Sequence, residues 1–292
     1  MIPVLWSGAG LVAVDKPPGV PVIPGRTEGA GPPLRARLEA QLGGPVWVVH
    51  RLDRDTSGVL LFALDAATHR AASLAFEQGR AEKVYLALVS PPLPGPLRVD
   101  VPLVPARRAR MRVARPGEEG KPAVTELSPL ETFGDVALVE ARPTTGRTHQ
   151  IRVHLRHAGA PLLVDPQYGR AEPVTERVLG GDSDAVVLDR TPLHAARLVL
   201  PASEGLPALD VRSPLPPDMA RASALLRQRM VKGSDVPRRP ARSKTWIWYW
   251  SAWSTVTVTV SVLTPPSNGP ETVGLIGAGD WFALPGAVNA DR

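Results

Sequence analysis

The stretch VVHRLDRDTSGVLLFA, residues 48–63, inserts a charged loop between two apolar runs. Residues 46–49 and 59–64 have the composition of two buried strands. The loop between them carries two aspartates, Asp53 and Asp55, among arginine and histidine side chains. A loop that is held by a strand at each end can position a reactive side chain closely. The stretch therefore predicts either an acid presented for chemistry or a surface turn with local ion pairs.

Two features of this loop favour a functional site over a simple turn. Arg51 and Arg54 can keep an aspartate ionised, because a nearby positive charge stabilises a carboxylate. Thr56, Ser57 and Gly58 can tie the loop together through hydrogen bonds to the backbone. We therefore expect a well-positioned, ionised carboxylate in the loop.

Strand patterns outnumber helix patterns along the rest of the chain, and most follow one another directly. Strands are predicted at residues 11–14, 83–89, 97–103, 108–113, 123–132, 136–141 and 193–200. Helices are predicted at residues 34–42, 65–78, 148–157 and 217–230. Asp65 is the expected N-cap of the second helix, and Gly79 is the residue expected to end it. Two hairpins are expected, 97–103 with 108–113 and 123–132 with 136–141. The pattern predicts an α+β fold with a mixed, largely antiparallel sheet and flanking helices and loops.

The composition excludes several kinds of site and points to a polyanionic partner. The chain of 292 residues has no cysteine, which excludes disulfides, thiolate metal sites and cysteine nucleophiles. Its formal net charge of +6 favours nucleic acid as the partner, although a biased genome composition would give the same charge. We recognise neither a signal peptide nor an apolar run long enough to span a bilayer. We therefore expect a cytoplasmic protein that does not bind a membrane.

Several motifs, in this order along the chain, resemble those of the pseudouridine synthases of the large-subunit rRNA and tRNA (RluA) class. The opening stretch is similar to the family signature H-R-L-D-x-x-T-S-G followed by an apolar strand. The other matches are KPPG at 16–19, EKVYLA at 82–87, GRTHQIRVHLRHAGAPLL at 146–163 and PLHA at 192–195. The resemblance covers roughly residues 5–230, and so many motifs in family order make it specific.

The resemblance implies a cofactor-free isomerase that converts uridine in rRNA or tRNA to pseudouridine. The N-glycosidic bond would break, the uracil would turn, and its C5 would rejoin C1′ of the ribose. Asp53 is then the catalytic carboxylate, either as a nucleophile on the sugar or as a base at it. Tyr85 would pack on the uracil and can take its C5 proton, and Arg152 would pair with Asp53. Arg51 would help to fill the gap left by the flipped-out nucleotide.

The candidate residues for binding the substrate RNA lie in the matched motifs and in one arginine-rich segment. They are His50, Arg51, Thr56, Ser57, Gly58, Lys83, Arg147, His149, Gln150, His194, Arg108, Arg110 and Arg112. We expect RNA to be the partner of a monomeric protein.

Three histidines near residue 150 raise the question of a metal site. His154 and His157 are three positions apart on the predicted helix, where they could share a ligand. His149 lies about 140° around the helix from His154, so the three cannot face one ion. No cysteine or cluster of carboxylates completes a ligand set. We therefore expect no metal ion.

Arginines gather in two segments that suit the binding of phosphates. The first set, at the start of the predicted helix 148–157, is Arg147, Arg152 and Arg156. The second set, which shares one face if residues 108–112 form a strand, is Arg108, Arg110 and Arg112. Such a face suits an arm that grips an RNA backbone, and it equally suits a charged edge strand that prevents aggregation.

Two positions depart from the family pattern. Val164 precedes the turn at 165–169, DPQYG, where the family commonly has glycine. The early turn continues into residues 20–25, VPVIPG, where a histidine is frequent in the family. Both positions lie outside the predicted catalytic residues, so they bear on the fit of the substrate more than on activity. The pattern begins close to Met1, and we therefore expect no N-terminal S4-like module.

Residues 1–231 are expected to form the catalytic domain, and residues 232–292 a linker and tail. The linker is basic and contains proline, and the tail is rich in tryptophan, threonine and valine. Residues 255–262 alternate as a strand does, but the sequence indicates no partner strand for them. A disordered extension, a strand added to the core and a segment not selected for this fold all stay open.

Two rival functions can be set against the isomerase. A catalytically silent RNA-binding or ribosome-assembly factor on the same fold is the alternative, and the intact Asp53, Tyr85 and Arg152 count against it. A glycosidase that uses Asp53 and Asp55 lacks a second, distant acid.

Overall fold

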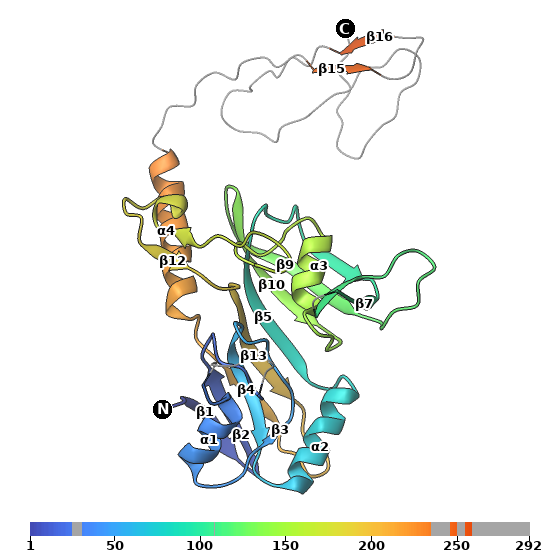
Figure 1. The fold of residues 1–292 in the computed structure, drawn as a ribbon, viewed down its shortest axis with the longest axis vertical. Helices are drawn as coiled ribbons and strands as arrows, with labels where there is room; N and C mark the ends of the chain where they lie inside the picture. Colours follow the sequence, from blue (N-terminus) through green and yellow to red (C-terminus); the bar gives the residue numbers. More distant parts are fainter. Residues whose placement is uncertain (25–30, 108, 235–245, 250–254, 259–292) are drawn as a thin grey trace. The chain divides into compact units, whose positions relative to one another are not determined.

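The computed structural model describes residues 1–24, 31–107, 109–234, 246–249 and 255–258 of the chain. It divides the chain into two units, Met1–Asp235 and Val236–Arg292. In the described part of the first unit, ten strands form one sheet with four α-helices around it (Figure 1). No helix in the described ranges is both long and apolar enough to cross a membrane.

The main strands of the sheet lie side by side in an order that differs from their order in the sequence. This spatial order is β1 (Val4–Gly8), β2 (Leu11–Lys16), β4 (Ser57–Ala63), β13 (Leu193–Leu200), β5 (Glu82–Val89), β10 (Val136–Pro143), β9 (Val124–Phe133) and β6 (Leu97–Asp100). The sheet is completed by β14 (Leu209–Arg212) on β13 and by β3 (Trp47–Val48) on β4. Two small pairs lie outside it, β7 (Leu103–Ala106) with β8 (Arg110–Val113) and β11 (Val174–Thr175) with β12 (Val186–Leu188). The helices are α1 (Leu34–Leu42), α2 (Ala66–Glu77), α3 (Gln150–His157), α4 (Pro217–Ser234) and a short 3-10 helix at Arg177–Leu179.

The sheet is mixed and largely antiparallel, which confirms the predicted fold class. Every strand pairing in it is antiparallel except that of β4 with β13. At this parallel contact Ala195 lies opposite Gly58, whose φ is 109°. A Cβ atom on Gly58 would lie 2.2 Å from the carbonyl oxygen of Ala195. Only glycine therefore allows β13 to approach β4 this closely.

The helices follow the sequence pattern closely, because their signals are local. The helix predicted at 34–42 is found with these bounds as α1. The N–H of Thr68 donates a 2.8 Å hydrogen bond to the carboxylate of Asp65, the N-cap of α2. Gly79 follows the helix with a φ of 70°, in the left-handed region that ends a helix. Helix α3 begins at Gln150, two residues later than predicted.

The predicted hairpin of residues 97–103 with 108–113 is wrong in part. Strand β6 ends at Asp100 and pairs with β9, while β7 pairs with β8 in a separate hairpin. Pro102 lies between β6 and β7 and has no N–H for a continuous ladder, which divides the expected long strand. The sequence pattern did not indicate β1, β14 or the pair of β11 with β12, all of which are short.

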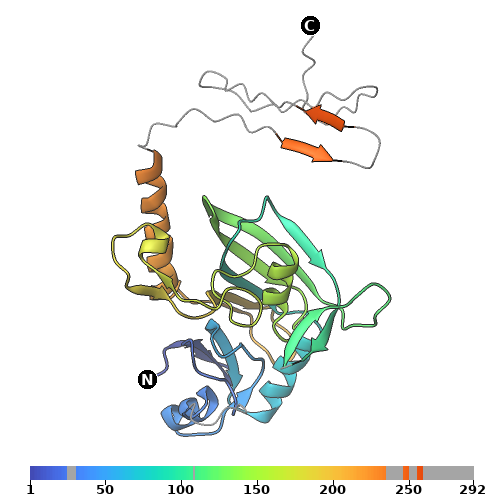
Figure 2. The same ribbon diagram turned by 45° about the horizontal axis from the view of Figure 1, so that its top comes forward.

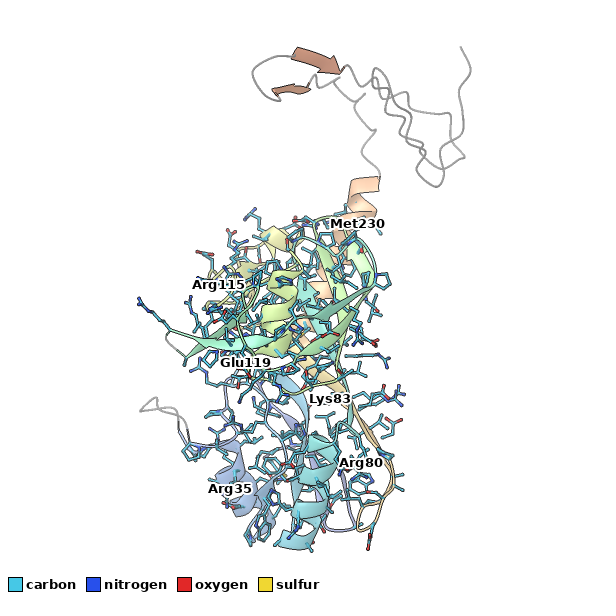
Figure 3. The ribbon with its side chains drawn as sticks, turned by 90° about the vertical axis from the view of Figure 1, so that its right-hand side faces the viewer. Arg35, Arg80, Lys83, Arg115, Glu119 and Met230 are labelled. Atoms are coloured by element: carbon cyan, nitrogen blue, oxygen red, sulfur yellow. The ribbon has the colours of Figure 1, made fainter. Side chains whose placement is uncertain are left out.

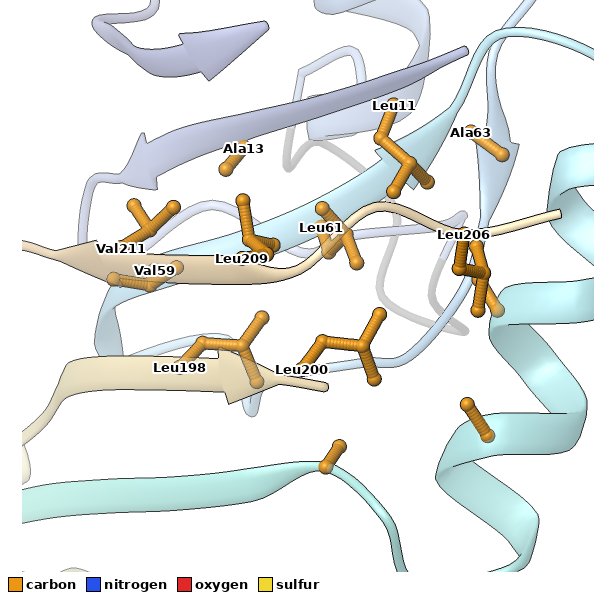
Figure 4. Close-up of a cluster of buried hydrophobic side chains, with 13 residues drawn as sticks. Leu11, Ala13, Val59, Leu61, Ala63, Leu198, Leu200, Leu206, Leu209 and Val211 are labelled. Carbon is orange, nitrogen blue, oxygen red and sulfur yellow. The ribbon is translucent and has the colours of Figure 1, made fainter. Parts of the chain in front are cut away.

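Buried apolar clusters attach the helices to different parts of the sheet. Figure 4 shows one cluster, in which Leu11, Leu61 and Leu198 from three strands pack together with alanines of α2. Ile151 and Leu155 attach α3 to β5, β9 and β10. Figure 2 shows the ribbon of α3 beside the green strands of the sheet. Met219, Ala222 and Leu226 bury one face of α4 in a further cluster. This packing leaves the first turn of α3 next to the loop that precedes β4.

In the second unit the described residues form one antiparallel hairpin. Strand β15 (Trp246–Tyr249) pairs with β16 (Thr255–Val258). The predicted strand at 255–262 is thus present over its first four residues, and β15 is the partner that the sequence analysis did not recognise. Residues 259–262 of that prediction lie outside the described residues.

Candidate active site

A cavity of about 930 Å³ lies among the β3–β4 loop, strand β5 and the start of α3. It gathers most of the predicted site residues on one wall: His50, Arg51, Asp53, Thr56, Lys83, Tyr85, Arg147, His149, Gln150 and Arg152. The predicted catalytic residues thus share one cavity, although they come from three separate segments of the chain. Ser57, Gly58, His194, Arg110 and Arg112 lie outside its wall.

The centre of the site is an ion pair between Asp53 and Arg152. Arg152 donates from Nη1 to Oδ2 of Asp53 at 3.1 Å. Its Nε and Nη2 donate to the two carboxylate oxygens of Asp165, both at 2.8 Å, and Nη2 also donates to Gln167. Burial lowers the pKa of Arg152, but the hydrogen bonds and charges of Asp165 and Asp53 outweigh this and raise it above its ordinary value. The guanidinium is therefore a permanent cation with a defined orientation.

Asp165 is a site residue that the sequence analysis did not predict. Its side chain is 1% exposed, and it also accepts the backbone N–H groups of Gln167 and Tyr168. It belongs to the 165–169 turn, which was noted only because Val164 precedes it. The signal that could have found it is an acidic residue in a turn shortly after a helix that carries a buried arginine.

Lys16 holds the loop that carries Asp53 in place through hydrogen bonds to its backbone. Its Nζ donates to the carbonyl oxygens of Pro17, Arg54 and Thr56 at 2.9, 2.7 and 2.7 Å. These three acceptors match the three protons of an ammonium group. The side chain is 0% exposed, and burial lowers its pKa to about 7. Lys16 was noted only as part of the KPPG match, so its contact with this loop is a further feature that the sequence did not indicate.

Neither arginine of the loop pairs with Asp53 within the described residues. Arg54 pairs with Asp55 at 3.1 Å instead, because the two are neighbours on the exposed side of the loop. Arg51 is exposed at the cavity and has no ion-pair partner within the described residues. The positive charge next to Asp53 comes from α3, 99 positions further along the chain.

Tyr85 and Lys83 point into the cavity from β5, where alternate residues share a face. Burial, followed by the charge of Asp53, raises the pKa of Tyr85 well above its ordinary value. Lys83 donates a long hydrogen bond of 3.4 Å to the carbonyl of Thr145, and burial lowers its pKa. In Figure 3, Lys83 is labelled between Arg80 below it and Glu119 above it. The cavity thus holds a neutral phenol and a lysine without a carboxylate partner in the described part of the chain.

His149 lies between the cavity and Tyr168. Its Nδ1 is 2.7 Å from the hydroxyl oxygen of Tyr168, and its Nε2 is 3.9 Å from Oδ2 of Asp53. The two rings meet edge to face, with centroids 5.5 Å apart. The ring of Tyr168 also lies under the guanidinium of Arg152, at 5.0 Å. Tyr168, which does not itself line the cavity, therefore contacts two residues that do, His149 and Arg152.

Several predicted binding residues have their polar atoms engaged inside the protein. His194 is fully buried and shares a 3.0 Å hydrogen bond with Ser57. Gln150 donates to the Val124 carbonyl and to Thr125, and its Oε1 accepts from the Thr145 hydroxyl and the Arg147 N–H. These side chains are placed to hold β4, β13 and the start of α3.

His50 and Thr56 line the cavity but also face inward. Nε2 of His50 accepts the backbone N–H of Leu61 at 3.2 Å, and its ring stacks on Phe76. Burial and then the charge of Lys83 lower the pKa of His50 to about 3, so it is neutral. Oγ1 of Thr56 is buried without a hydrogen-bond partner in the described ranges. In the opening loop, Arg51 and Asp53 therefore line the cavity with charged side chains, whereas His50 and Thr56 have buried polar atoms.

Several arginines of the two predicted segments are engaged within the protein. Arg152 is buried in its ion pairs and unavailable to phosphate, which corrects the predicted basic helix start. Arg147 donates to the Pro122 carbonyl from the loop before α3. On β8, Arg112 pairs with Glu118 at 2.6 Å, whereas Arg110 is exposed without a carboxylate partner in the described residues. Arg108 lies outside the described residues. No cluster of potential metal ligands occurs in the described ranges.

The sequence profile of a known family matches the part of the chain that builds this cavity. The profile is described as RNA pseudouridylate synthase, and it matches residues 10–157, which include Asp53, Tyr85 and Arg152. The chain belongs to this family. A ribosomal large subunit pseudouridine synthase D of Nitrosomonas europaea is 39% identical over 224 residues. A ribosomal large subunit pseudouridine synthase C of Vibrio cholerae is 34% identical over 231 residues. The family suggested by the motifs is thus confirmed.

The extent of these matches differs between sequences and structures. The two alignments cover 74% and 77% of this chain, and 63% and 69% of the respective relatives. The chain thus spans less than two thirds of the length of the Nitrosomonas relative. The solved structure of human RNA pseudouridylate synthase domain containing 4 has a TM-score of 0.61 at 29% identity. The match covers 77% of this chain and 93% of that structure, and it supports the same fold.

Proposed function

We propose that this protein is an RNA pseudouridine synthase that isomerises uridine in RNA of the large ribosomal subunit. The observation that carries the proposal is the pairing of Asp53 with the buried Arg152 in a cavity that also contains Tyr85. The two relatives above are named as synthases of the large ribosomal subunit, which favours this RNA over tRNA. We further propose that residues 1–231 are the catalytic domain and that the protein acts as a monomer in the cytoplasm.

In the proposed reaction the bond between N1 of uracil and C1′ of ribose breaks. The uracil turns within the cavity, and C5 forms a bond to C1′. C5 loses one proton and N1 gains one, so the product is an isomer and the reaction needs no cofactor. Asp53 acts at the sugar, as a nucleophile or as a base. Arg152 holds its carboxylate in place through a guanidinium that is already oriented by Asp165.

We assign Tyr85 the role of packing on the uracil. Its raised pKa keeps the phenol protonated at neutral pH, so no phenolate is present there to accept a proton. A flat, neutral ring can hold the detached base during its rotation without reacting with it. This argument favours the first of the two roles that the resemblance implies for Tyr85 and disfavours its role as the acceptor of the C5 proton.

We assign Arg51 and Lys83 to the RNA backbone and to the gap that the flipped nucleotide leaves. Arg51 is exposed at the cavity, and Lys83 has only one weak hydrogen bond. A guanidinium can both stack on bases and donate to them, which suits Arg51 to the vacancy. Lys83 is partly removed from water and has no carboxylate partner in the described residues, so an anionic phosphate would stabilise its ammonium form. Lys83 therefore suits the phosphate backbone of the target nucleotide.

The proposal is tested by comparing pseudouridine maps of total RNA from cells with and without the protein. We expect at least one large-subunit rRNA position to lose pseudouridine in the deletion strain. Adding the purified protein to that RNA should restore the modification. Asp53→Asn should abolish it, whereas Asp55→Asn, the same change two positions away and outside the cavity wall, should not. Identical maps from the two strains would contradict the proposed function. Restoration of the modification by Asp53→Asn would contradict the role of Asp53.

A further inference from the structure

His149 has an unfavourable backbone conformation directly before α3. Its φ of 54° and ψ of 19° lie in the left-handed region, which residues with a Cβ atom rarely adopt. The imidazole lines the cavity, and on its other side the hydroxyl oxygen of Tyr168, which does not line the cavity, lies 2.7 Å from Nδ1. Strain of this kind persists where the surrounding contacts over-determine it, and it is frequent at functional sites. The position of the ring therefore calls for a functional explanation.

The hydroxyl of Tyr168 determines which nitrogen of His149 carries the proton. The Tyr168 oxygen accepts the backbone N–H of Met111 at 2.8 Å, and its proton is then available to be donated to Nδ1 of His149, 2.7 Å away. Burial lowers the pKa of His149, so the imidazole is neutral. A neutral imidazole that accepts a hydrogen bond at Nδ1 carries its proton on Nε2. An N–H donor of His149 thus faces the cavity.

This donor faces Asp53 across a gap of defined width. Nε2 of His149 is 3.9 Å from Oδ2 of Asp53, longer than a direct N–H···O hydrogen bond of about 2.7–3.2 Å. A single oxygen atom about 2.8 Å from each of them would fill the gap. It would have to accept from His149 and donate to the carboxylate, and only a hydroxyl group or a water molecule does both.

We propose that His149 and Asp53 together bind the 2′-hydroxyl of the target uridine, an inference that rests on the proposed function. An internal ribonucleotide has one free hydroxyl, because its 3′ and 5′ oxygens are esterified. That hydroxyl is on C2′, next to C1′, where Asp53 acts in the proposed reaction. His149 is therefore a residue that selects RNA over DNA at the target position, since DNA lacks the 2′-hydroxyl. Tyr168 is a positioning residue that keeps the donor on Nε2.

The test uses two synthetic RNAs that span a uridine identified by the mapping experiment. One is all ribose, and the other has 2′-deoxyuridine at the target position alone. Single-turnover rates are measured for the wild type, for His149→Ala and for Tyr168→Phe. The matched control is His157→Ala, the same change at an exposed histidine in the last turn of α3.

Removal of the 2′-hydroxyl should slow the wild type and His157→Ala by about tenfold or more, the effect of one hydrogen bond to a charged group. The same removal should slow His149→Ala by about threefold or less, because Asp53 alone then contacts the hydroxyl. Tyr168→Phe should show an intermediate ratio, because Nδ1 of His149 can then keep the proton. A purely structural role of His149 would lower both rates and leave their ratio unchanged.

The outcomes separate this inference from the function on which it rests. Equal ratios in the wild type, His149→Ala and Tyr168→Phe would mean that water fills the gap, and they would overturn the inference alone. If His149→Ala does not fold, the ratio for Tyr168→Phe decides in the same way. A folded wild type that converts no uridine in the all-ribose RNA or in rRNA would overturn the proposed function and the inference with it.

Discussion

Arg152 on α3 donates a 3.1 Å hydrogen bond to Asp53, a residue 99 positions earlier in the chain. The same guanidinium donates two hydrogen bonds of 2.8 Å to Asp165, which does not line the cavity. Asp165 therefore orients the cation that holds the reactive carboxylate before any substrate enters. An arrangement that is fixed in advance needs little reorganisation during a reaction, and this is the main electrostatic advantage of a protein site over water.

Asp165→Asn is expected to lower both stability and activity. The change leaves the buried guanidinium of Arg152 without its main counter-charge, and breaking a buried pair costs about 3 kcal/mol of unfolding free energy. Urea denaturation measures this loss, and a single-turnover assay should show a large fall in rate. Asp184→Asn is the matched control, because it breaks an exposed pair with Arg177 and should leave both values unchanged. Equal effects of the two variants would contradict the role of Asp165.

Lys16→Met is expected to remove a pH dependence of stability. The folded-state pKa of Lys16 is about 7, below its ordinary value of 10.5, so the unfolded chain binds more protons between these values. The unfolding free energy of the wild type therefore gains up to about 1.4 kcal/mol per pH unit from this group as pH rises in that window. The difference in unfolding free energy between the wild type and Lys16→Met should therefore shift in favour of the wild type as pH rises from about 7 to about 10.

Urea denaturation at several pH values measures the difference between the two proteins. Lys121→Met, which removes an exposed lysine, is the control for the loss of one positive charge. Parallel stability curves for the wild type and Lys16→Met would show that burial does not lower the pKa of Lys16.

Gly58→Ala is expected to disrupt the contact between β4 and β13. The added Cβ atom would lie 2.2 Å from the carbonyl oxygen of Ala195, and the φ of 109° is unfavourable for alanine. We expect a loss of at least about 3 kcal/mol in unfolding free energy, or a marked loss of soluble protein. Gly44→Ala is the control, because a Cβ atom there meets no heavy atom within 4 Å. Wild-type stability of Gly58→Ala would contradict the parallel pairing.

Arg110→Ala is expected to weaken RNA binding through the loss of one phosphate contact. Arg110 is exposed on β8 and has no carboxylate partner in the described residues. The slope of log affinity against log salt concentration should fall in magnitude by about 0.7 to 0.9. Arg98→Ala is the matched control, because Arg98 on β6 pairs with Asp100 on the same strand and with Glu126 on β9. An unchanged slope for Arg110→Ala would favour the alternative that this charge serves only to protect a strand edge.

The helices were predicted well because their signals lie within a few residues. The carboxylate of Asp65 caps α2 from the position next to it, and Gly79 ends that helix in the left-handed conformation. The pairing of strands was predicted less well. Pro102 interrupts the expected hairpin, and β6 finds its partner in β9 instead of β8. Strand partners depend on packing across the whole sheet, which a local pattern does not contain.

The site shows the same division between local and distant information. The motif indicated Asp53, Tyr85 and Arg152, and the structure brings all three to one cavity. Serine and histidine side chains can bind RNA, and Ser57 and His194 were predicted to do so. In the structure they instead share a hydrogen bond with each other inside the fold. The type of a residue does not reveal which side of the sheet its side chain faces. That side depends on how β4 and β13, which carry Ser57 and His194, align with each other in the sheet.

By itself, the sequence determined the α+β class, the helices with their caps, and the motifs that place this chain in its family. The resemblance also implied the pair of Arg152 with Asp53, whereas only the tertiary structure decided the other partners of these charged groups. Arg54 contacts Asp55, Arg152 also contacts Asp165, and Lys16 contacts two carbonyl groups of the reactive loop, those of Arg54 and Thr56. The physical reason is range: hydrogen bonds and ion pairs act within about 4 Å, and the fold sets these distances between residues far apart in the chain.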